Sequence, residues 1–309
     1  MSLPRKAQRR GRVAEVVLAA AAMFVIAGSA SPAAAQNQIL DLPTPSIVPP
    51  PLTGDIEAVG KRAFWRAGRT RWFFASTMEA GNLYLRGGGA VGYGKPHWQW
   101  VGVEGSSAIS VGGGVAYGGL RFASPYVDLR AGARYTFAMG QTFVAPQPDG
   151  AYTREDREAE GGPPLRYVNL EAEVASGYPL FGGALFGIAG FYYVTGTPQG
   201  WNLFEQTLQV MAEPSILWRA RAGYLKSVDR WDSFRVGGAV EVIGNPERDL
   251  VVVRLGPSVT TMITHHLEAF GSALFVVHSR DSIGLAGAQL GELGFRYRWA
   301  TGDRWPEFP

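Results

Sequence analysis

The sequence predicts an all-β chain folded as an antiparallel β-barrel of about 12 strands, and three observations lead to this fold class. Apolar and polar side chains alternate with period two over many short segments, which is the repeat of a strand. Turn residues separate these segments at regular spacing. Charged residues keep to one face of each segment, and 41 glycines in 309 residues weaken a helical alternative.

The clearest segment is 125–138, PYVDLRAGARYTFA. One face holds only apolar residues, whereas the other carries Asp128, Arg130 and Arg134. A helix would spread the apolar residues around its axis, so this stretch is predicted to be a strand.

In the next alternating stretch, 166–174, one face carries Glu171 and Glu173, and the other carries the apolar residues Val168, Leu170, Ala172 and Val174. If it pairs antiparallel with the preceding strand, opposite charges meet across the pair. An uncharged face backed by a charged one suits a transmembrane barrel with lipid outside and a polar interior.

Twelve segments from residue 71 onward show the pattern. They are Trp72–Glu79, Leu83–Tyr93, His97–Glu104, Ala108–Phe122, Tyr126–Ala138, Tyr167–Ser176, Leu180–Val194, Ile216–Lys226, Phe234–Ile243, Leu250–Ile263, Leu267–His278 and Leu285–Trp299. An even number agrees with single-chain bacterial barrels, in which both ends lie in the periplasm. Trp201–Glu213 also alternates but breaks at Pro214, so 10 to 14 strands stay open.

The connections predict which end of the barrel faces outward. The long polar connection 140–165 follows the fifth strand and is expected outside the cell, whereas 177–179 and 264–266 are expected to be short periplasmic turns. Two readings compete with the barrel. A soluble β-sandwich would alternate in the same way, and the uncharged stretch 180–194 could be a transmembrane helix, although four glycines oppose that reading.

The N-terminus predicts export. Residues 1–35 combine a basic start, an apolar run of 12 residues over Val16–Ala27 and an Ala-x-Ala site before Gln36, as a secretory signal peptide does. The apolar run is shorter than the roughly 20 residues of a membrane-spanning helix. Residues 36–70 form a proline-rich periplasmic linker whose last part, 55–70, is either a short helix or a strap at the mouth of the barrel.

Composition limits the function. Removing residues 1–35 takes five basic residues and Glu15 from totals of 29 and 26, which leaves 24 basic and 25 acidic residues and no case for nucleic-acid binding. The absence of cysteine excludes disulfides, thiolate catalysis and zinc-cysteine sites. Nine tryptophans and 12 tyrosines suit the aromatic girdles of a membrane barrel.

A signal peptide, alternating strands and an aromatic-rich last strand together resemble the Gram-negative outer-membrane β-barrels. The resemblance covers residues 71–299, and the chain departs from the pattern by continuing through a tail, 300–309. It implies that the protein lies in the cell outer membrane, in contact with outer-membrane lipid and with the barrel assembly machinery, and that it could reach periplasmic or envelope-complex proteins through residues 36–70.

The histidines do not indicate an enzyme. Outer-membrane phospholipases and lipid A deacylases carry a His-x-Ser pattern, whereas His278 and Ser279 are adjacent and face opposite ways. Asp281 and Ser282 follow in a predicted turn, and the pair at 265–266 is expected to be solvated. We therefore predict no catalytic residues, no cofactor and no metal site.

The inward charges define the candidate site. The lumen-facing candidates are Asp128, Arg130, Arg134, Glu171, Glu173, Arg219, Arg221, Arg235, Glu241, Arg254, Glu292, Arg296 and Arg298. They either pair with one another and fill a narrow lumen, or line an aqueous pore and set its selectivity. A barrel of about 12 strands is intermediate in width between one filled by its side chains and an open porin, so a partly filled lumen is favoured. Two functions follow, a porin-like channel for small solutes or an anchoring barrel of an envelope-spanning secretion or motility assembly.

Overall fold

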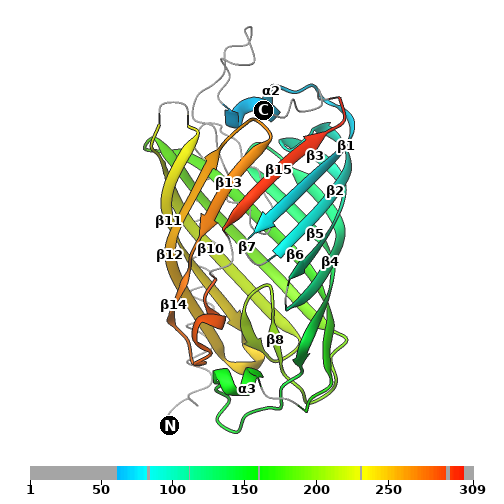
Figure 1. Cartoon of the computed structure of the whole chain (residues 1–309), viewed down its shortest axis with the longest axis vertical. Coiled ribbons are helices and arrows are strands. Elements are labelled where there is room, and N and C mark those ends of the chain that lie inside the picture. The colour runs from blue at the N-terminus through cyan, green and yellow to red at the C-terminus, as the bar shows by residue number, and fades with distance from the viewer. Residues whose placement is uncertain are drawn as a thin grey trace, which may run out of the picture. The chain divides into compact units, whose positions relative to one another are not determined.

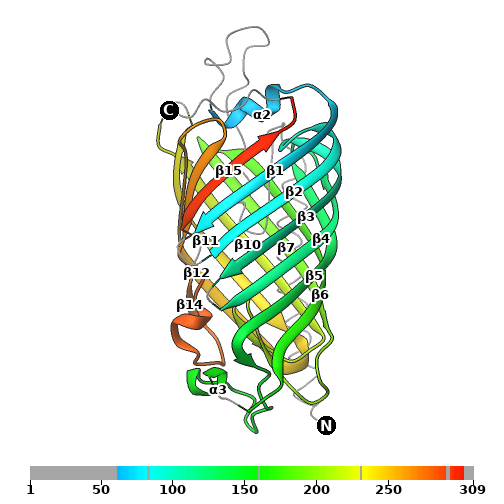
Figure 2. The ribbon, with the colours of Figure 1, turned by 45° about the vertical axis from the view of Figure 1, so that its right-hand side comes forward.

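The protein forms one closed antiparallel β-barrel. The computed structural model describes residues 61–81, 84–110, 112–158, 161–229, 232–289 and 293–302, and the predicted signal peptide and most of the linker lie outside these residues. Neighbouring strands in the wall follow chain order, and the pairs β11–β12 and β1–β15 close the sheet. Figures 1 and 2 show the strongly tilted strands of this barrel.

The wall is built from long strands. They are β1 (Arg71–Gly81), β2 (Tyr84–Lys95), β3 (Gln99–Ser110), β4 (Gly113–Ala123), β5 (Val127–Thr142), β6 (Pro164–Leu180), β7 (Gly183–Thr195), β10 (Ile216–Ser227), β11 (Phe234–Asn245), β12 (Leu250–Met262), β13 (Leu267–Ser272), β14 (Phe275–His278) and β15 (Gly294–Ala300). Both β13 and β14 pair with β12, so they are two parts of one interrupted strand. The predicted fold class, with 12 strands in the wall, is confirmed.

Short elements fill the connections. They are η3 (Lys61–Ala63), α2 (Phe64–Ala67), α3 (Arg154–Glu158), β8 (Leu203–Glu205), β9 (Val210–Ala212), η4 (Pro246–Arg248) and η5 (Gly284–Gly287). β8 and β9 pair only with each other, so Trp201–Glu213 is a separate hairpin and adds no strand to the wall. Among the described residues, no helix is both long enough and apolar enough to cross a membrane.

Each strand turns its apolar face outward. In β5 Leu129 is 44% exposed, whereas its neighbours Asp128 and Arg130 are buried in the interior. Leu120 on the neighbouring strand β4 and Phe295 on β15 are more than half exposed. A soluble sandwich would bury these side chains between two sheets, so that alternative is wrong. The helix alternative is wrong as well, because Gly183–Thr195 pairs as β7 with strands on both sides.

Several predicted boundaries are wrong for local reasons. Ala108 belongs to β3, because β3 and β4 stay paired until Ser110 and turn at Gly112. The stretch 177–179 lies inside β6, and the turn falls at 181–182, where both residues have positive φ. The last strand begins only at Gly294, after a 3-10 helix at 284–287.

The two ends of the barrel differ. At the turn end, short connections join β2–β3, β4–β5, β6–β7, β10–β11 and β12–β13, and the chain enters β1 and leaves β15 there. At the loop end lie the long connections 143–163, 196–215 and 279–293. Within the described part of the linker, Lys61–Ala67 form a short helical segment across the turn end, which we call the strap.

The outward face makes a testable prediction. Leu129→Arg should destabilise the barrel in a bilayer by about 2–4 kcal/mol, because arginine is costly at mid-membrane depth on the lipid face of a barrel. Leu129→Ala is the matched control and should cost much less. Unfolding in lipid vesicles measures both, and equal effects would mean that this face does not meet lipid.

Candidate functional site

The interior of the barrel holds buried ion pairs. Arg130 on β5 donates to Glu171 at 3.0 Å and to Glu173 at 2.8 Å, both on β6. Arg134 binds the second oxygen of Glu171, and Arg219 on β10 binds Glu173 at 2.9 Å. All five side chains are at most 6% exposed. Buried charges persist only when paired and hydrogen-bonded, so these residues act as one network.

A second group lies on the inner faces of β10, β11 and β12. Glu241 accepts hydrogen bonds from Arg221 at 2.7 Å and from Arg254 at 2.8 Å. Arg254 also donates to the carbonyls of Leu208 and Gln209, at 2.7 and 2.9 Å. This group therefore ties the wall to the hairpin between β8 and β9.

The hairpin, residues 201–213, packs inside the barrel against the wall near the loop end. Leu203, Leu208 and Val210 pack in one apolar cluster with inward residues of β6, β7, β10, β11 and β12. Its Glu205 is fully buried and accepts hydrogen bonds from Tyr167 and Asn169 of β6, at 3.2 and 3.0 Å. A connection of the loop end thus folds inward and becomes part of the core.

The loop end is further held by Arg248 in η4. It makes a bidentate pair with Asp281, with distances of 2.9 and 2.6 Å, and also donates to the carbonyls of Met211 and Gly150. Tyr152 lies under the Arg248 guanidinium, 4.6 Å from it. One arginine of the short β11–β12 connection therefore joins two long connections, 143–163 and 279–293, to the hairpin.

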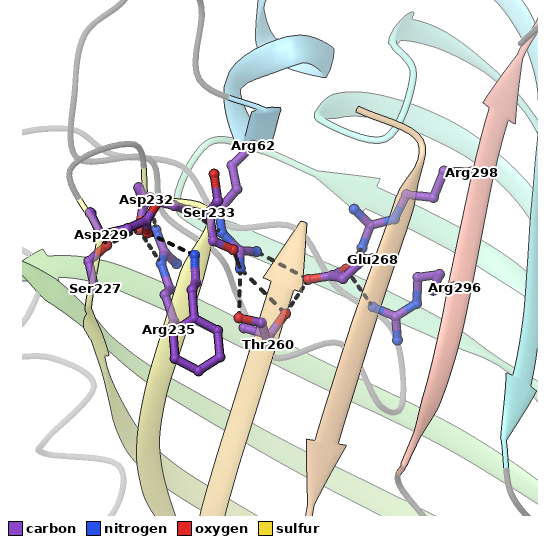
Figure 3. A network of polar contacts seen from close by, with 11 residues as sticks. Arg62, Ser227, Asp229, Asp232, Ser233, Arg235, Thr260, Glu268, Arg296 and Arg298 are labelled. Atoms are coloured by element: carbon purple, nitrogen blue, oxygen red, sulfur yellow. Dashed lines mark hydrogen bonds and ion pairs between the residues drawn. The ribbon is translucent and has the colours of Figure 1, made fainter. Parts of the chain in front are cut away.

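At the turn end, the strap inserts Arg62 into the barrel (Figure 3). Arg62 donates to Glu268 of β13 at 3.1 Å, to the carbonyl of Asp232 at 2.8 Å and to the carbonyl of Ser233 at 3.2 Å. Glu268 also binds Arg298 at 3.1 Å. A single buried carboxylate therefore holds the strap and β15 to β13.

Aromatic side chains close the turn end beneath the strap. Trp65 of α2 packs with Phe73, Trp98 and Trp100 in one buried cluster. Phe64 stacks on His265 with ring centroids 5.0 Å apart. The strap is thus fixed by both a charged side chain and an apolar one.

The structure places the predicted lumen residues as follows. All but Glu292, which lies outside the described residues, are buried in the interior. Asp128 pairs with Arg121, and Arg235 pairs with Asp232 at the turn end. They do not converge on one centre, because they spread along the whole barrel in several groups.

Sequence reasoning missed several residues of this interior. They are Arg62, Glu79, Arg86, Glu104, Arg121, Glu205, Arg248, Glu268 and Asp281. Glu79, Glu104 and Arg121 have the inward parity of their strands, so the alternation itself could have identified them. Nothing in the sequence marks Glu205 or Arg62 as inserted, because each lies in a connection.

The histidine grouping does not form a catalytic set in the described residues. The backbone amide of Asp281 donates to Ser279, and Asp281 is bound by Arg248, while no hydrogen bond joins His278 to either residue. His266 contacts the carbonyl of Arg298 through Nδ1 at 2.8 Å. Across the described ranges, no three acidic or histidine side chains gather as a metal site.

His97 predicts a dependence of stability on pH. It lies in the β2–β3 turn, and its Nε2–H donates to the Trp299 carbonyl at 3.0 Å. Burial, followed by the positive charge of Arg298, lowers the pKa of His97 to about 3. In the unfolded chain this imidazole binds a proton near pH 6.5, whereas in the folded chain it does so only near pH 3. The free energy of unfolding is therefore highest above pH 6.5 and decreases as the pH falls toward 3.

We expect the melting temperature in detergent to fall between pH 7.5 and 4.5. His97→Gln should reduce that fall, and His278→Gln on the exposed end of β14 is the control. An identical fall in the His97 variant would contradict this assignment.

The known proteins to which the chain is similar are solved structures. No protein-family model and no curated protein matches the chain. A NanC porin aligns with a TM-score of 0.34 and 7% identity over 74% of this chain and 98% of that chain.

Two structures of OmpT, an outer membrane protein of Vibrio cholerae, align similarly. Its loop L8 deletion mutant has a TM-score of 0.33 and 9% identity over 74% of this chain and 99% of that chain. Its in-vitro folded form has a TM-score of 0.30 and 8% identity over 74% and 97%. These scores are low, so the fold assignment stands on the strand pairing of the chain itself.

Proposed function

We propose that the protein is an outer-membrane β-barrel with a filled lumen, and that it anchors its own N-terminal segment at the periplasmic face. The observation that carries the proposal is the filling of the lumen. Paired arginines and carboxylates occupy its length, the hairpin 201–213 occupies the loop end, and the strap covers the turn end. An open porin instead keeps a water-filled interior.

The outward apolar face supports the assignment of the protein to the outer membrane. A closed barrel satisfies every backbone hydrogen bond within its wall, and is therefore one of the two architectures that can cross a bilayer. Short turns face the periplasm and long loops face outward in such barrels, so the turn end is assigned to the periplasm. A barrel of this kind should resist unfolding in detergent until heated and should fractionate with outer membranes.

The anchoring role is supported by the way the strap is held. Lys61 donates to the carbonyls of Ile263 and Met262 at 2.9 and 3.3 Å, and Arg62 reaches Glu268 inside the barrel. These contacts fix Lys61 and Arg62 at the turn end, and the proline-rich residues 36–54 precede them in the sequence. We assign to residues 36–54 the role of contacting periplasmic or envelope-complex partners.

Conductance in planar bilayers tests the proposal. We expect no steady open-pore current from the purified full chain, with a known porin incorporated under the same conditions as a control. Partners recovered from native membranes should depend on residues 36–54. A large ohmic conductance would overturn the anchoring role.

A second candidate is a gated channel for small solutes. The inner faces of β2 and β3 carry small residues, namely Gly88, Ala90, Ser106 and Ala108, so the lumen is less filled on this side. This path ends at the aromatic cluster beneath Trp65. Trp65→Ala should produce a current if the cluster is a gate, and a silent variant would favour the anchor.

A further inference from the structure

A small polar cavity lies inside the barrel between the inner faces of β1 to β4. Its lining includes Arg86, Glu104, Arg121, Arg298 and Tyr117, together with Ser106. The aromatic cluster that contains Phe73 and Trp100 bounds it toward the turn end. The cavity belongs to neither the hairpin nor the ion-pair groups of β5 to β12.

The charged groups that line this cavity are mostly positive. Arg86, Arg121 and Arg298 line it, and Glu104 is the one carboxylate in its described lining. Arg86 pairs with Glu79, Arg121 with Glu104 and Asp128, and Arg298 with Glu268. A positive lining of this kind favours an anion over a cation.

The weakest of these ion pairs involves Arg86. Its Nη1 is 3.8 Å from Glu79, which is beyond hydrogen-bond distance, and its Nη2 donates to Ser106 at 3.3 Å. Glu79 accepts a shorter hydrogen bond, 2.7 Å, from Arg296. Arg86 therefore keeps donor capacity on the side of the cavity.

Tyr117 supplies a donor with no partner in the described part of the chain. Its side chain is 7% exposed, and its hydroxyl makes no hydrogen bond there. The ring extends over Gly119, where a Cβ atom would lie 2.4 Å from the hydroxyl oxygen. Glycine at 119 thus leaves room for a hydroxyl that lines the cavity, and buried hydroxyls without a partner are rare.

The size of the cavity limits the ligand. It measures about 30 Å³, whereas one buried water needs roughly 10–15 Å³ on this scale. Sugars, nucleotides and aromatic acids are too large. We propose that this cavity binds a small monovalent anion, of the size of chloride, bromide or acetate, between Arg86, Ser106 and Tyr117.

The test compares sodium salts at one ionic strength, with gluconate as an anion too large to enter. Bromide and chloride should raise the melting temperature of the full chain in detergent in a saturable way, and gluconate should not. Crystals grown in bromide should show an anomalous peak in the cavity. Equal melting temperatures in all three salts, or an empty cavity in bromide, would overturn the proposal.

Two variants separate binding from folding. Tyr117→Phe removes a hydroxyl without a protein partner, so it should leave the melting temperature in gluconate unchanged and weaken bromide binding. Arg86→Gln should weaken binding by about tenfold or more, as the loss of a hydrogen bond to a charged group predicts. Arg154→Gln, on an exposed side chain of α3, is the control. Unchanged bromide affinity in both cavity variants would overturn the site, while conductance tests the anchoring role independently.

Discussion

Glu171→Gln is expected to lower the free energy of unfolding by about 3–5 kcal/mol, which is the cost of breaking a buried pair by removing one partner. Glu171 is buried and binds both Arg130 and Arg134, so the substitution leaves two guanidinium groups short of an acceptor. Thermal or denaturant unfolding in detergent measures the effect.

A double-mutant cycle of Glu171→Gln with Arg130→Gln shows whether the loss of this ion pair causes the destabilisation. Loss of both partners should cost less than the sum of the single losses, with a coupling of about 0.5–3 kcal/mol. The exposed pair Arg154–Glu158 on α3 is the control and should show no measurable coupling. A coupling near zero at Arg130 and Glu171, together with altered ion selectivity in bilayers, would indicate a water-filled pore instead of a filled lumen.

Glu268→Gln is expected to destabilise the barrel by about 3–5 kcal/mol and to release the strap, because the buried carboxylate compensates several arginines. Glu268 binds Arg62, Arg296 and Arg298, and it accepts a hydrogen bond from Thr260. Limited proteolysis should then cleave the chain near Lys61 faster than in the unmodified protein.

Lys61→Gln is the matched control for this prediction. It removes only hydrogen bonds from the strap to backbone carbonyls at the rim, so it should change cleavage much less. If proteolysis of the Glu268 variant matches that of the unmodified chain, the strap is held mainly by the aromatic cluster around Trp65.

The wall of the barrel was predictable because alternation is a local property. Each wall strand overlaps a predicted segment, and the pairing of Arg130 with Glu171 and Glu173 follows from the neighbouring positions of β5 and β6. The direction of the apolar face could not be read from one strand. It is set by the closure of the sheet, which turns Leu129 outward and Arg130 inward.

The inserted segments were not predictable from the same pattern. Trp201–Glu213 alternates as a wall strand would, yet it is a hairpin buried by the tertiary fold around it. The contact of Arg62 with Glu268 spans most of the chain, so no local window contains it. Both depend on contacts between residues distant in sequence.

The closing seam of the barrel implies an order of assembly. β15 pairs with β1 only from Ala75–Ala300 to Gly81–Gly294, and these are the first and last strands of the wall. Contacts of such long range form late in folding, because the chain must first lose the entropy of the whole intervening loop. We therefore expect the hairpin to enter while the sheet is still open, since a hydrogen-bonded wall would bar it afterwards. Pairing of β1 with β15 would then be the last step of folding, and it would trap the hairpin inside the closed barrel.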